Sequence, residues 1–259
     1  MFEKKKEFKL ITKKNPKSLL PNALTIFGVC LGLSSIKFAL DTNYAMAIIA
    51  IGFAAILDTL DGRVARLIKG TSKVGKELDS LTDVISFGVA PGFIMYFWTL
   101  NEIGKFGWMF VLIYTVCCAL RLARFNLMVI EENETWKINF FEGVPSPAAA
   151  GLVLMPLILS LSGIIQFENY TVSSSIAILT TSILMVSKVP TYSLKRILIP
   201  RHLAIFLLLG IGIYVSLLIF YTFETLFFTG LIYIFLIPIS YFHYRYRNKA
   251  SLIAISEEE

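Results

Sequence analysis

The chain has 259 residues, of which 56% are hydrophobic and only 16% are charged, and its formal net charge is +6. Soluble domains are usually about 45–50% apolar and about 25% charged. The composition therefore excludes a disordered protein, a secreted disulfide scaffold and an ordinary soluble enzyme. It indicates an integral membrane protein.

Long apolar stretches predict the fold, because a transmembrane helix needs about 20 mainly apolar residues. Such stretches occur at 22–40, 44–61, 84–100, 106–127, 147–165, 172–188, 203–221 and 226–244. We predict an all-α polytopic membrane helix bundle of about eight transmembrane helices, six in a core and two after it. The expected divisions are a basic amphipathic cytoplasmic segment (1–21), a core (22–190), a loop with two additional spans (191–244) and a cytoplasmic tail (245–259).

The distribution of basic residues predicts the orientation. In an eight-span arrangement, 22 of the 24 Lys and Arg residues fall on one side, and only Lys37 and Lys105 fall on the other. Lys and Arg near span ends remain in the cytoplasm, so we expect both termini there, in a multi-pass protein of the inner cell membrane. The lysine-rich segment 1–21 is either an interfacial helix on anionic lipids or a charge run without fixed structure.

Four aspartates occur where apolar spans meet the expected cytoplasmic face. Asp58 and Asp61 are three residues apart, and Asp79 and Asp83 are four apart, so each pair shares a helix face. Converging carboxylates repel one another unless cations balance them, and Arg66 alone cannot. Hard divalent cations can, since Mg²⁺ and Mn²⁺ prefer oxygen ligands. We predict two such ions rather than four solvated or helix-capping aspartates.

Small and polar residues beside the aspartates suit a phosphate ligand. Gly62, Ala65 and Gly75 leave room for close approach. Arg66 lies eight residues after Asp58 on the same helix face, and a guanidinium binds phosphate in a bidentate manner. Ser72 offers a hydroxyl donor. We interpret the region as a diphosphate site.

The pattern Asp58-x-x-Asp61-Gly62-x-x-Ala65-Arg66, then eight residues, then Gly75-x-x-x-Asp79-x-x-x-Asp83 resembles the signature of the CDP-alcohol phosphatidyltransferase family. The resemblance implies that Asp58, Asp61 and Asp79 bind metal and that Asp83 is both a metal ligand and the catalytic base. It implies CDP-diacylglycerol as a substrate. Residues expected to contact that lipid are Asn22, Ala23, Leu24, Thr25, Gly62, Ala65, Arg66, Ser72 and Gly75.

Three further segments resemble the phosphatidylserine synthase branch of that family: LDSLTDVISFGVAPG, CALRLARFN (118–126) and FFEGVPSPAAAGLV (140–153). This resemblance implies L-serine as the second substrate, whose carboxylate needs a cation. Arg121 and Arg124, on one face of the fourth span, are candidates for binding this carboxylate or a phosphate. Positive-inside anchoring is the alternative explanation for both.

The expected reaction converts CDP-diacylglycerol and L-serine into phosphatidylserine and CMP. The nearest alternative is a sister transferase that uses glycerol 3-phosphate, inositol phosphate or choline. A transporter or channel is the remote alternative, and no acid pair at a span midplane supports it. We expect an anionic lipid bilayer as the environment, a homodimer as the assembly, and no nucleic acid partner.

Overall fold

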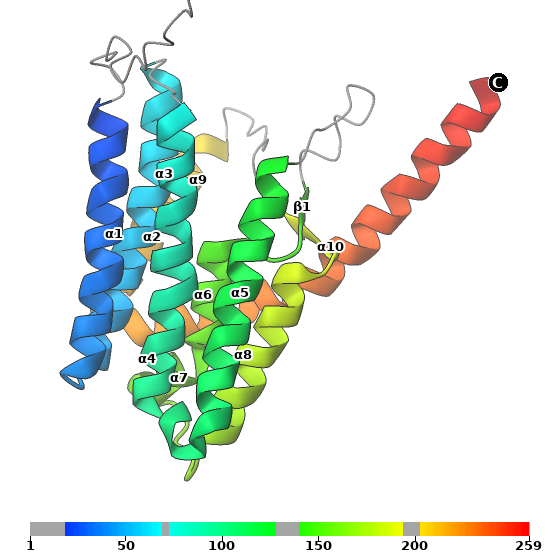
Figure 1. The fold of residues 1–259 in the computed structure, drawn as a ribbon. Coiled ribbons are helices and arrows are strands. Elements are labelled where there is room, and N and C mark those ends of the chain that lie inside the picture. The colour runs from blue at the N-terminus through cyan, green and yellow to red at the C-terminus, as the bar shows by residue number, and fades with distance from the viewer. Residues whose placement is uncertain (1–18, 69–72, 128–139, 194–202, 259) are drawn as a thin grey trace, which may run out of the picture.

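The computed structural model describes residues 19–68, 73–127, 140–193 and 203–258. Long helices lie side by side in a bundle, and the C-terminal helix leaves the bundle at an angle (Figure 1). The predicted all-α membrane bundle is confirmed. The proposed interfacial segment before residue 19 and the predicted ligand Ser72 lie outside the described residues.

The first half of the chain forms two helical hairpins. Helices α1 (Leu19–Leu40) and α2 (Tyr44–Leu67) are joined by a tight turn, in which the side chain of Asn43 accepts a hydrogen bond from Met46 N (3.2 Å). The second hairpin consists of α3 (Lys73–Asp83), the π-helical segment η2 (Val84–Val89), α4 (Ala90–Trp98), the 3₁₀ turn η3 (Leu100–Ile103) and α5 (Lys105–Leu127).

The second half contains shorter helices and a small sheet. Its helices are α6 (Ser146–Val153), α7 (Met155–Ser162), α8 (Thr171–Val186), α9 (Ala204–Phe220) and α10 (Thr222–Glu258). Strands β1 (Phe140–Glu142) and β2 (Pro190–Tyr192) pair antiparallel, with Phe141 opposite Thr191. These two short strands are a local departure from the predicted all-α fold. Their pairing holds the segment before α6 next to the segment after α8.

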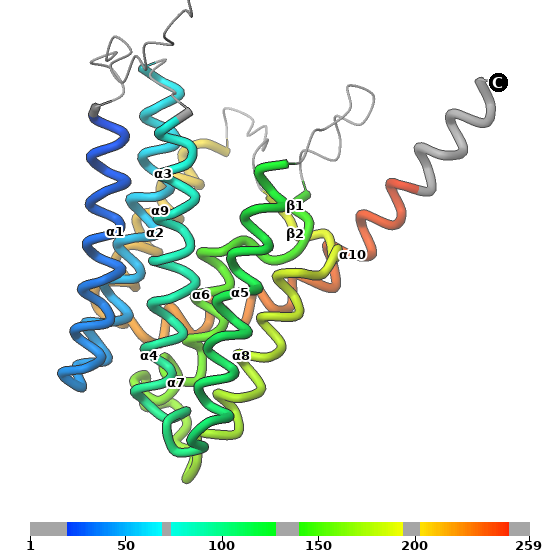
Figure 2. Tube along the Cα trace, viewed as in Figure 1, coloured from blue at the N-terminus to red at the C-terminus, as the bar shows by residue number. Residues whose placement is uncertain are grey.

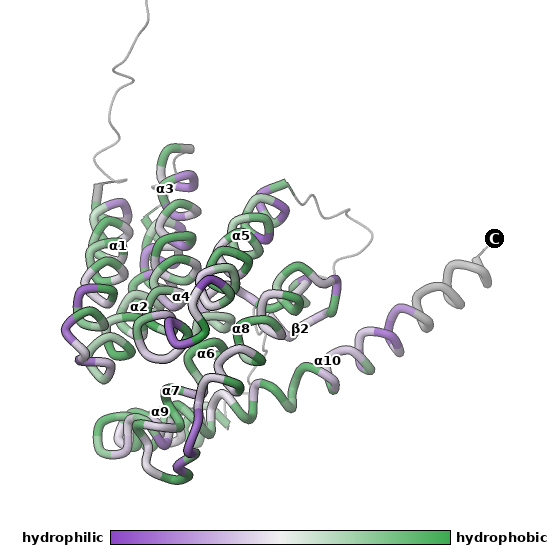
Figure 3. Tube along the Cα trace, turned by 60° about the horizontal axis from the view of Figure 1, so that its bottom comes forward, coloured by the Kyte–Doolittle hydropathy of each residue, from purple (hydrophilic) through white to green (hydrophobic). Residues whose placement is uncertain are grey.

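Within the described residues, five helical segments are long and apolar enough to span a membrane, which indicates a multi-pass membrane protein. They are Leu20–Leu40, Tyr44–Leu67, Val74–Trp98, Lys105–Leu127 and Thr222–Asn248. Figure 3 shows hydrophobic residues along most of the length of the bundle helices.

The other three predicted spans correspond to shorter helices. The span predicted at 147–165 is divided at Leu154 into α6 and α7, just before Pro156. Proline lacks the amide hydrogen that continues a helix. α8 has 16 residues and α9 has 17. The count of eight therefore stays a prediction.

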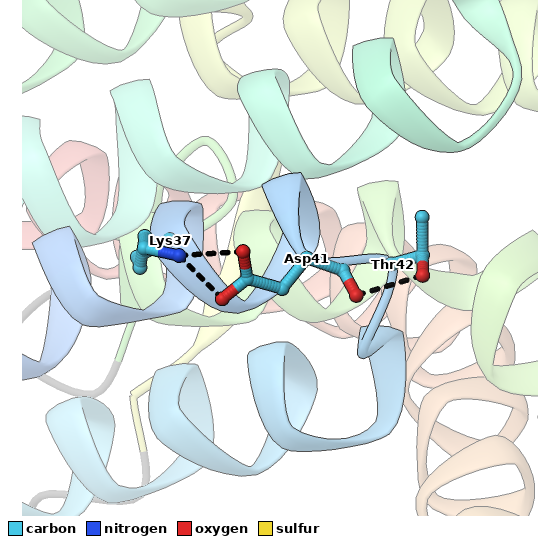
Figure 4. Close-up of polar contacts among 3 residues, drawn as sticks. All are labelled: Lys37, Asp41 and Thr42. Carbon is cyan, nitrogen blue, oxygen red and sulfur yellow. Dashed lines mark hydrogen bonds and ion pairs between the residues drawn. The ribbon is translucent and has the colours of Figure 1, made fainter.

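The two ends of the bundle differ in the basic residues that they carry. The end of α2, the start of α3 and the end of α5 lie at one end of the bundle, uppermost in Figure 2. Lys37 and Lys105 lie at the opposite end. There, Lys37 Nζ lies 2.5 Å from both carboxylate oxygens of Asp41, and Thr42 Oγ1 donates to Asp41 O (Figure 4). This pair neutralises one of the two basic residues expected on that side.

Candidate active site

Three carboxylates meet where α2 faces α3. Asp58 and Asp61 on α2 and Asp79 on α3 each present a carboxylate oxygen, and these oxygens lie within 4.8 Å of one another. Asp61 is only 4% exposed, and the other two are half-buried. The i,i+3 spacing on α2 places both of its aspartates toward α3. The predicted convergence of these three residues is confirmed.

Asp83, the last residue of α3, lies next to this group. It interacts electrostatically with Asp58 and Asp79, and its Oδ1 atom is buried and has no hydrogen-bond partner among the described residues. Lys37–Asp41 is the single ion pair within 4.0 Å in the described part of the chain. None of the four carboxylates is therefore paired there with a Lys or Arg.

This donor set fits a divalent metal ion. Buried carboxylates are strongly disfavoured without a compensating cation. Here they converge without an ion pair and leave Asp83 Oδ1 unpartnered. Oxygen-only donors in such a group are the ligands that hard cations prefer. The acidic group could thus hold a metal ion.

Helix α1 orients one of these carboxylates. Thr25 is buried, and its hydroxyl donates to Asp61 Oδ2 over 2.6 Å; Pro21 O lies 3.0 Å from the same hydroxyl oxygen. A hydrogen bond to an ionised group is about twice as strong as one between neutral groups. The bond therefore fixes the side chain of Asp61 and connects the start of α1 to the acidic group.

The π-helical segment η2 directly follows Asp83, and side chains of α5 support its irregular backbone. In an α-helix, Pro91 would be the donor to Phe87 O, but proline has no amide hydrogen. Tyr114 on α5 donates its hydroxyl to Phe87 O instead, over 2.7 Å, and Thr115 Oγ1 lies 3.4 Å from Gly88 O. Side chains of α5 thus satisfy backbone groups that the irregular helix releases.

Close packing against α1 holds the same segment from the other side. Ser86 Oγ donates to Gly28 O (3.2 Å), and a Cβ atom added to Gly32 would lie 2.9 Å from Ser86 Cα. Only glycine allows this approach. The α1 backbone and the Tyr114 side chain together fix η2, and η2 begins directly after Asp83.

The two candidate arginines have different surroundings. Arg121 is 7% exposed and donates from Nη1 to Ser146 Oγ on α6 (2.8 Å). It also interacts electrostatically with Asp83. Arg124 Nη2 donates to Val186 O at the end of α8 (2.9 Å). Arg121 therefore lies near the acidic group, whereas Arg124 binds the carbonyl end of a helix.

The residues expected to contact the CDP-lipid lie at the same end of the bundle as the carboxylates. Asn22, Ala23, Leu24 and Thr25 are in the first turns of α1, Gly62, Ala65 and Arg66 are near the end of α2, and Gly75 is in the first turn of α3. Of these, Thr25 is turned toward Asp61. Their contacts with a lipid remain predictions.

Sequence reasoning missed the residues that support the site. Tyr114 binds a backbone carbonyl 27 residues away, Ser86 reaches α1, and Ser146 holds Arg121. One local signal was available: Pro91, eight residues after Asp83, predicts an irregular helix. The partner that compensates for the irregularity is visible only in the folded chain.

Comparison with known proteins agrees with this site. Residues 18–192 match the model of the CDP-alcohol phosphatidyltransferase family. The match covers more than half of the chain, and all four aspartates lie within it. The chain belongs to the CDP-alcohol phosphatidyltransferase family, and the resemblance seen in the sequence is confirmed.

Similar proteins include three that carry the name CDP-diacylglycerol–serine O-phosphatidyltransferase. The Mycobacterium leprae protein is 40% identical over 187 residues, which are 72% of this chain and 62% of that protein. The Mycobacterium tuberculosis protein is 39% identical over 200 residues, 75% of this chain and 68% of that protein. The Bacillus subtilis protein is 34% identical over 177 residues, 68% of this chain and 92% of that protein.

Proposed function

We propose that the chain transfers the phosphatidyl group of CDP-diacylglycerol to the hydroxyl of L-serine, giving phosphatidylserine and CMP. The observation that carries this proposal is the acidic group of Asp58, Asp61 and Asp79, with Asp83 beside it, inside the family match. The names of the mycobacterial and Bacillus relatives support serine as the acceptor.

The proposed cofactor is Mg²⁺ or Mn²⁺, with two ions held by Asp58, Asp61, Asp79 and Asp83. When bound, these ions would supply positive charge to the diphosphate and make CMP a better leaving group. The clustered oxygens and the unpartnered Asp83 Oδ1 support this assignment. Thr25 contributes by fixing the Asp61 carboxylate.

Asp83 is the proposed general base. The serine hydroxyl oxygen attacks the phosphorus that carries the diacylglycerol group, its proton passes to an Asp83 oxygen, and the bond to the CMP oxygen breaks. Asp83 suits this role because one of its oxygens is buried, makes no hydrogen bond in the described structure, and lies next to the metal-binding group. The π-helical segment beyond it holds the residue in place.

The nucleotide and lipid bind, in this proposal, between the start of α1 and the α2–α3 connection. Arg66 would bind a phosphate of CDP, while Gly62, Ala65 and Gly75 allow the diphosphate to approach the helices. Asn22, Ala23, Leu24 and Ser72 complete the expected contacts. Arg121 would bind the serine carboxylate, a role that its burial and its electrostatic interaction with Asp83 support.

The site is proposed to face the cytoplasm from the inner cell membrane, with both termini on that side. The excess of Lys and Arg at the end of the bundle that carries the aspartates supports this orientation. The division of the chain into segments 1–21, 22–190, 191–244 and 245–259 belongs to the same proposal. The homodimer also belongs to this proposal.

An acceptor competition assay tests the proposal. Purified full-length protein is given CDP-diacylglycerol and Mg²⁺ or Mn²⁺, and CMP release is measured without acceptor and with serine, glycerol 3-phosphate, inositol phosphate or choline. Serine should stimulate release and yield phosphatidylserine. Stimulation by another alcohol alone would identify a sister transferase and overturn the serine assignment.

A further inference from the structure

A cavity lies beside the C-terminal helix, apart from the carboxylates. It has a volume of about 300 Å³ and is lined by Thr191, Tyr192, Tyr233, Leu236 and Ile237, from β2 and α10. Its walls are mainly apolar, and Tyr233 is one of the two tyrosines that line it. The cavity is large enough for a small polar molecule.

Tyr233, which lines this cavity, and Asp83 beside the acidic group both have a buried polar atom without a partner among the described residues. Arg121 Nε and Tyr233 Oη are both buried and make no hydrogen bond among the described residues, as is true of Asp83 Oδ1. Arg121 interacts electrostatically with both Asp83 and Tyr233. Buried polar atoms nearly always have partners in native proteins. Three such atoms on side chains that interact electrostatically with one another through Arg121 indicate a place for a polar ligand.

Thr191 does not supply the missing partner of Tyr233. Tyr233 Oη has no hydrogen-bond partner among the described residues. The Thr191 hydroxyl instead donates to Gly143 O over 2.8 Å. The proton of the Tyr233 hydroxyl therefore remains available to a ligand.

The packing of α10 places Tyr233 at this position. One turn earlier, the side chain of Met155 on α7 packs directly over Gly230 of α10, since a Cβ atom added there would lie 2.3 Å from Met155 Sδ. Residues three apart share a helix face. Tyr233 is thereby turned toward the buried core, against which its ring packs.

We infer that Tyr233 is a specificity-determining residue of the acceptor site, where its hydroxyl donates a hydrogen bond to the carboxylate of serine beside Arg121. This inference rests on the proposed function. The acceptor hydroxyl would face Asp83 and the acceptor carboxylate would face Arg121 and Tyr233. Since Tyr233 lies outside the family match at 18–192, we expect it to adjust acceptor affinity rather than to carry the reaction.

The test is a two-substrate kinetic matrix on purified full-length Tyr233→Phe protein. The substitution removes one hydroxyl and keeps the ring. We expect the serine KM to rise about 10-fold, which corresponds to about 1.4 kcal/mol at 25 °C. The CDP-diacylglycerol KM and kcat should stay within about 2-fold of the unsubstituted protein. Tyr241→Phe is the matched control, because this exposed tyrosine lies on the same helix.

The outcomes separate this inference from the function on which it rests. Failure of serine to stimulate CMP release by the unsubstituted protein would overturn the proposed function itself. Normal serine use with an unchanged serine KM in Tyr233→Phe would overturn only the role of Tyr233. A parallel rise in both KM values with a lower melting temperature would also overturn it, because that pattern marks a structural residue.

Discussion

Thr25 and Asp61 lie on different helices and share a hydrogen bond of 2.6 Å. Both residues are buried, and Thr25 belongs to the segment expected to contact the CDP-lipid. The bond therefore joins the proposed lipid site to the proposed metal site. A change at Thr25 should be transmitted to the metal through one carboxylate.

Thr25→Val keeps the shape of the side chain and removes the donor to Asp61. A hydrogen bond to a charged group contributes about 1.5–3 kcal/mol, so we expect the Mn²⁺ concentration for half-maximal activity to rise at least about 10-fold. The measurement is CMP release over a Mn²⁺ titration. Thr180→Val is the control, because this exposed threonine bonds only within its own helix. Equal metal dependence in the two variants would contradict the role given to Thr25.

Removal of the metal should abolish activity. Because three acidic side chains converge, with Asp83 beside them and no ion pair in the described structure, we expect EDTA to stop CMP release and Mg²⁺ or Mn²⁺ to restore it. Asp58→Asn and Asp79→Asn should each lower kcat/KM by about 100-fold or more, since loss of a ligand displaces the ion.

The control for these variants is Asp41→Asn, at the opposite end of the bundle. Asp41 is exposed and pairs with Lys37, and exposed ion pairs contribute only about 0–1 kcal/mol. This variant should retain activity within about 2-fold. Full activity of the unsubstituted protein after exhaustive chelation would disprove the metal assignment.

Tyr114→Phe tests the irregular helix. The variant leaves Phe87 O buried without its donor, which costs about 1–3 kcal/mol, so the melting temperature in detergent should fall. Since η2 follows Asp83 directly, kcat should fall more than either KM rises. Tyr96→Phe is a suitable control, because Tyr96 is half-buried and its ring packs against the rings of Phe97 and Trp108, contacts that phenylalanine preserves. A lower melting temperature with unchanged kcat would show that η2 does not position Asp83.

The helices and the acidic group could be predicted because local rules determine them. Apolar length alone placed the first two helices and α5 near their observed positions. The spacing of Asp58 and Asp61 placed both carboxylates on one face, and a short connection brought α3 opposite. Each of these inferences depends on residues close together in sequence.

The supporting contacts could not be predicted, since they join distant parts of the chain. Arg121 and Arg124 are equivalent by sequence, three residues apart in one helix. Only the packing of α6 and α8 gives Arg121 a hydroxyl partner and Arg124 a carbonyl partner. Likewise, Tyr233 is one of several tyrosines near the C-terminus. The packing of Met155 over Gly230, one turn earlier, places Tyr233 against the core.

The orientation can be tested with reporters. A reporter fused after Glu259 should be cytoplasmic, and a tag placed between residues 166 and 170 should face the other side, because 22 of 24 basic residues are expected on the cytoplasmic side. Protease protection in sealed membrane vesicles measures both. Cytoplasmic signals from both positions would disprove the predicted count of spans.

The last prediction concerns the two arginines. Arg121 is buried near Asp83, so Arg121→Lys should weaken serine binding, because a point charge replaces a planar fork of donors. A lost charge-assisted hydrogen bond of about 1.5–3 kcal/mol corresponds to a rise of roughly 10- to 150-fold in the serine KM. The CDP-diacylglycerol KM should change by no more than a few-fold.

Arg124→Gln is the matched comparison on the same helix. Arg124 Nη2 binds Val186 O at the end of α8, where a cation also interacts favourably with the helix dipole. We therefore expect a lower melting temperature and a nearly unchanged serine KM. The measurement is a two-substrate kinetic matrix with a thermal melt for each protein. A larger serine effect from Arg124→Gln than from Arg121→Lys would reverse the two roles, and a change confined to the CDP-diacylglycerol KM would make the arginine concerned a phosphate ligand.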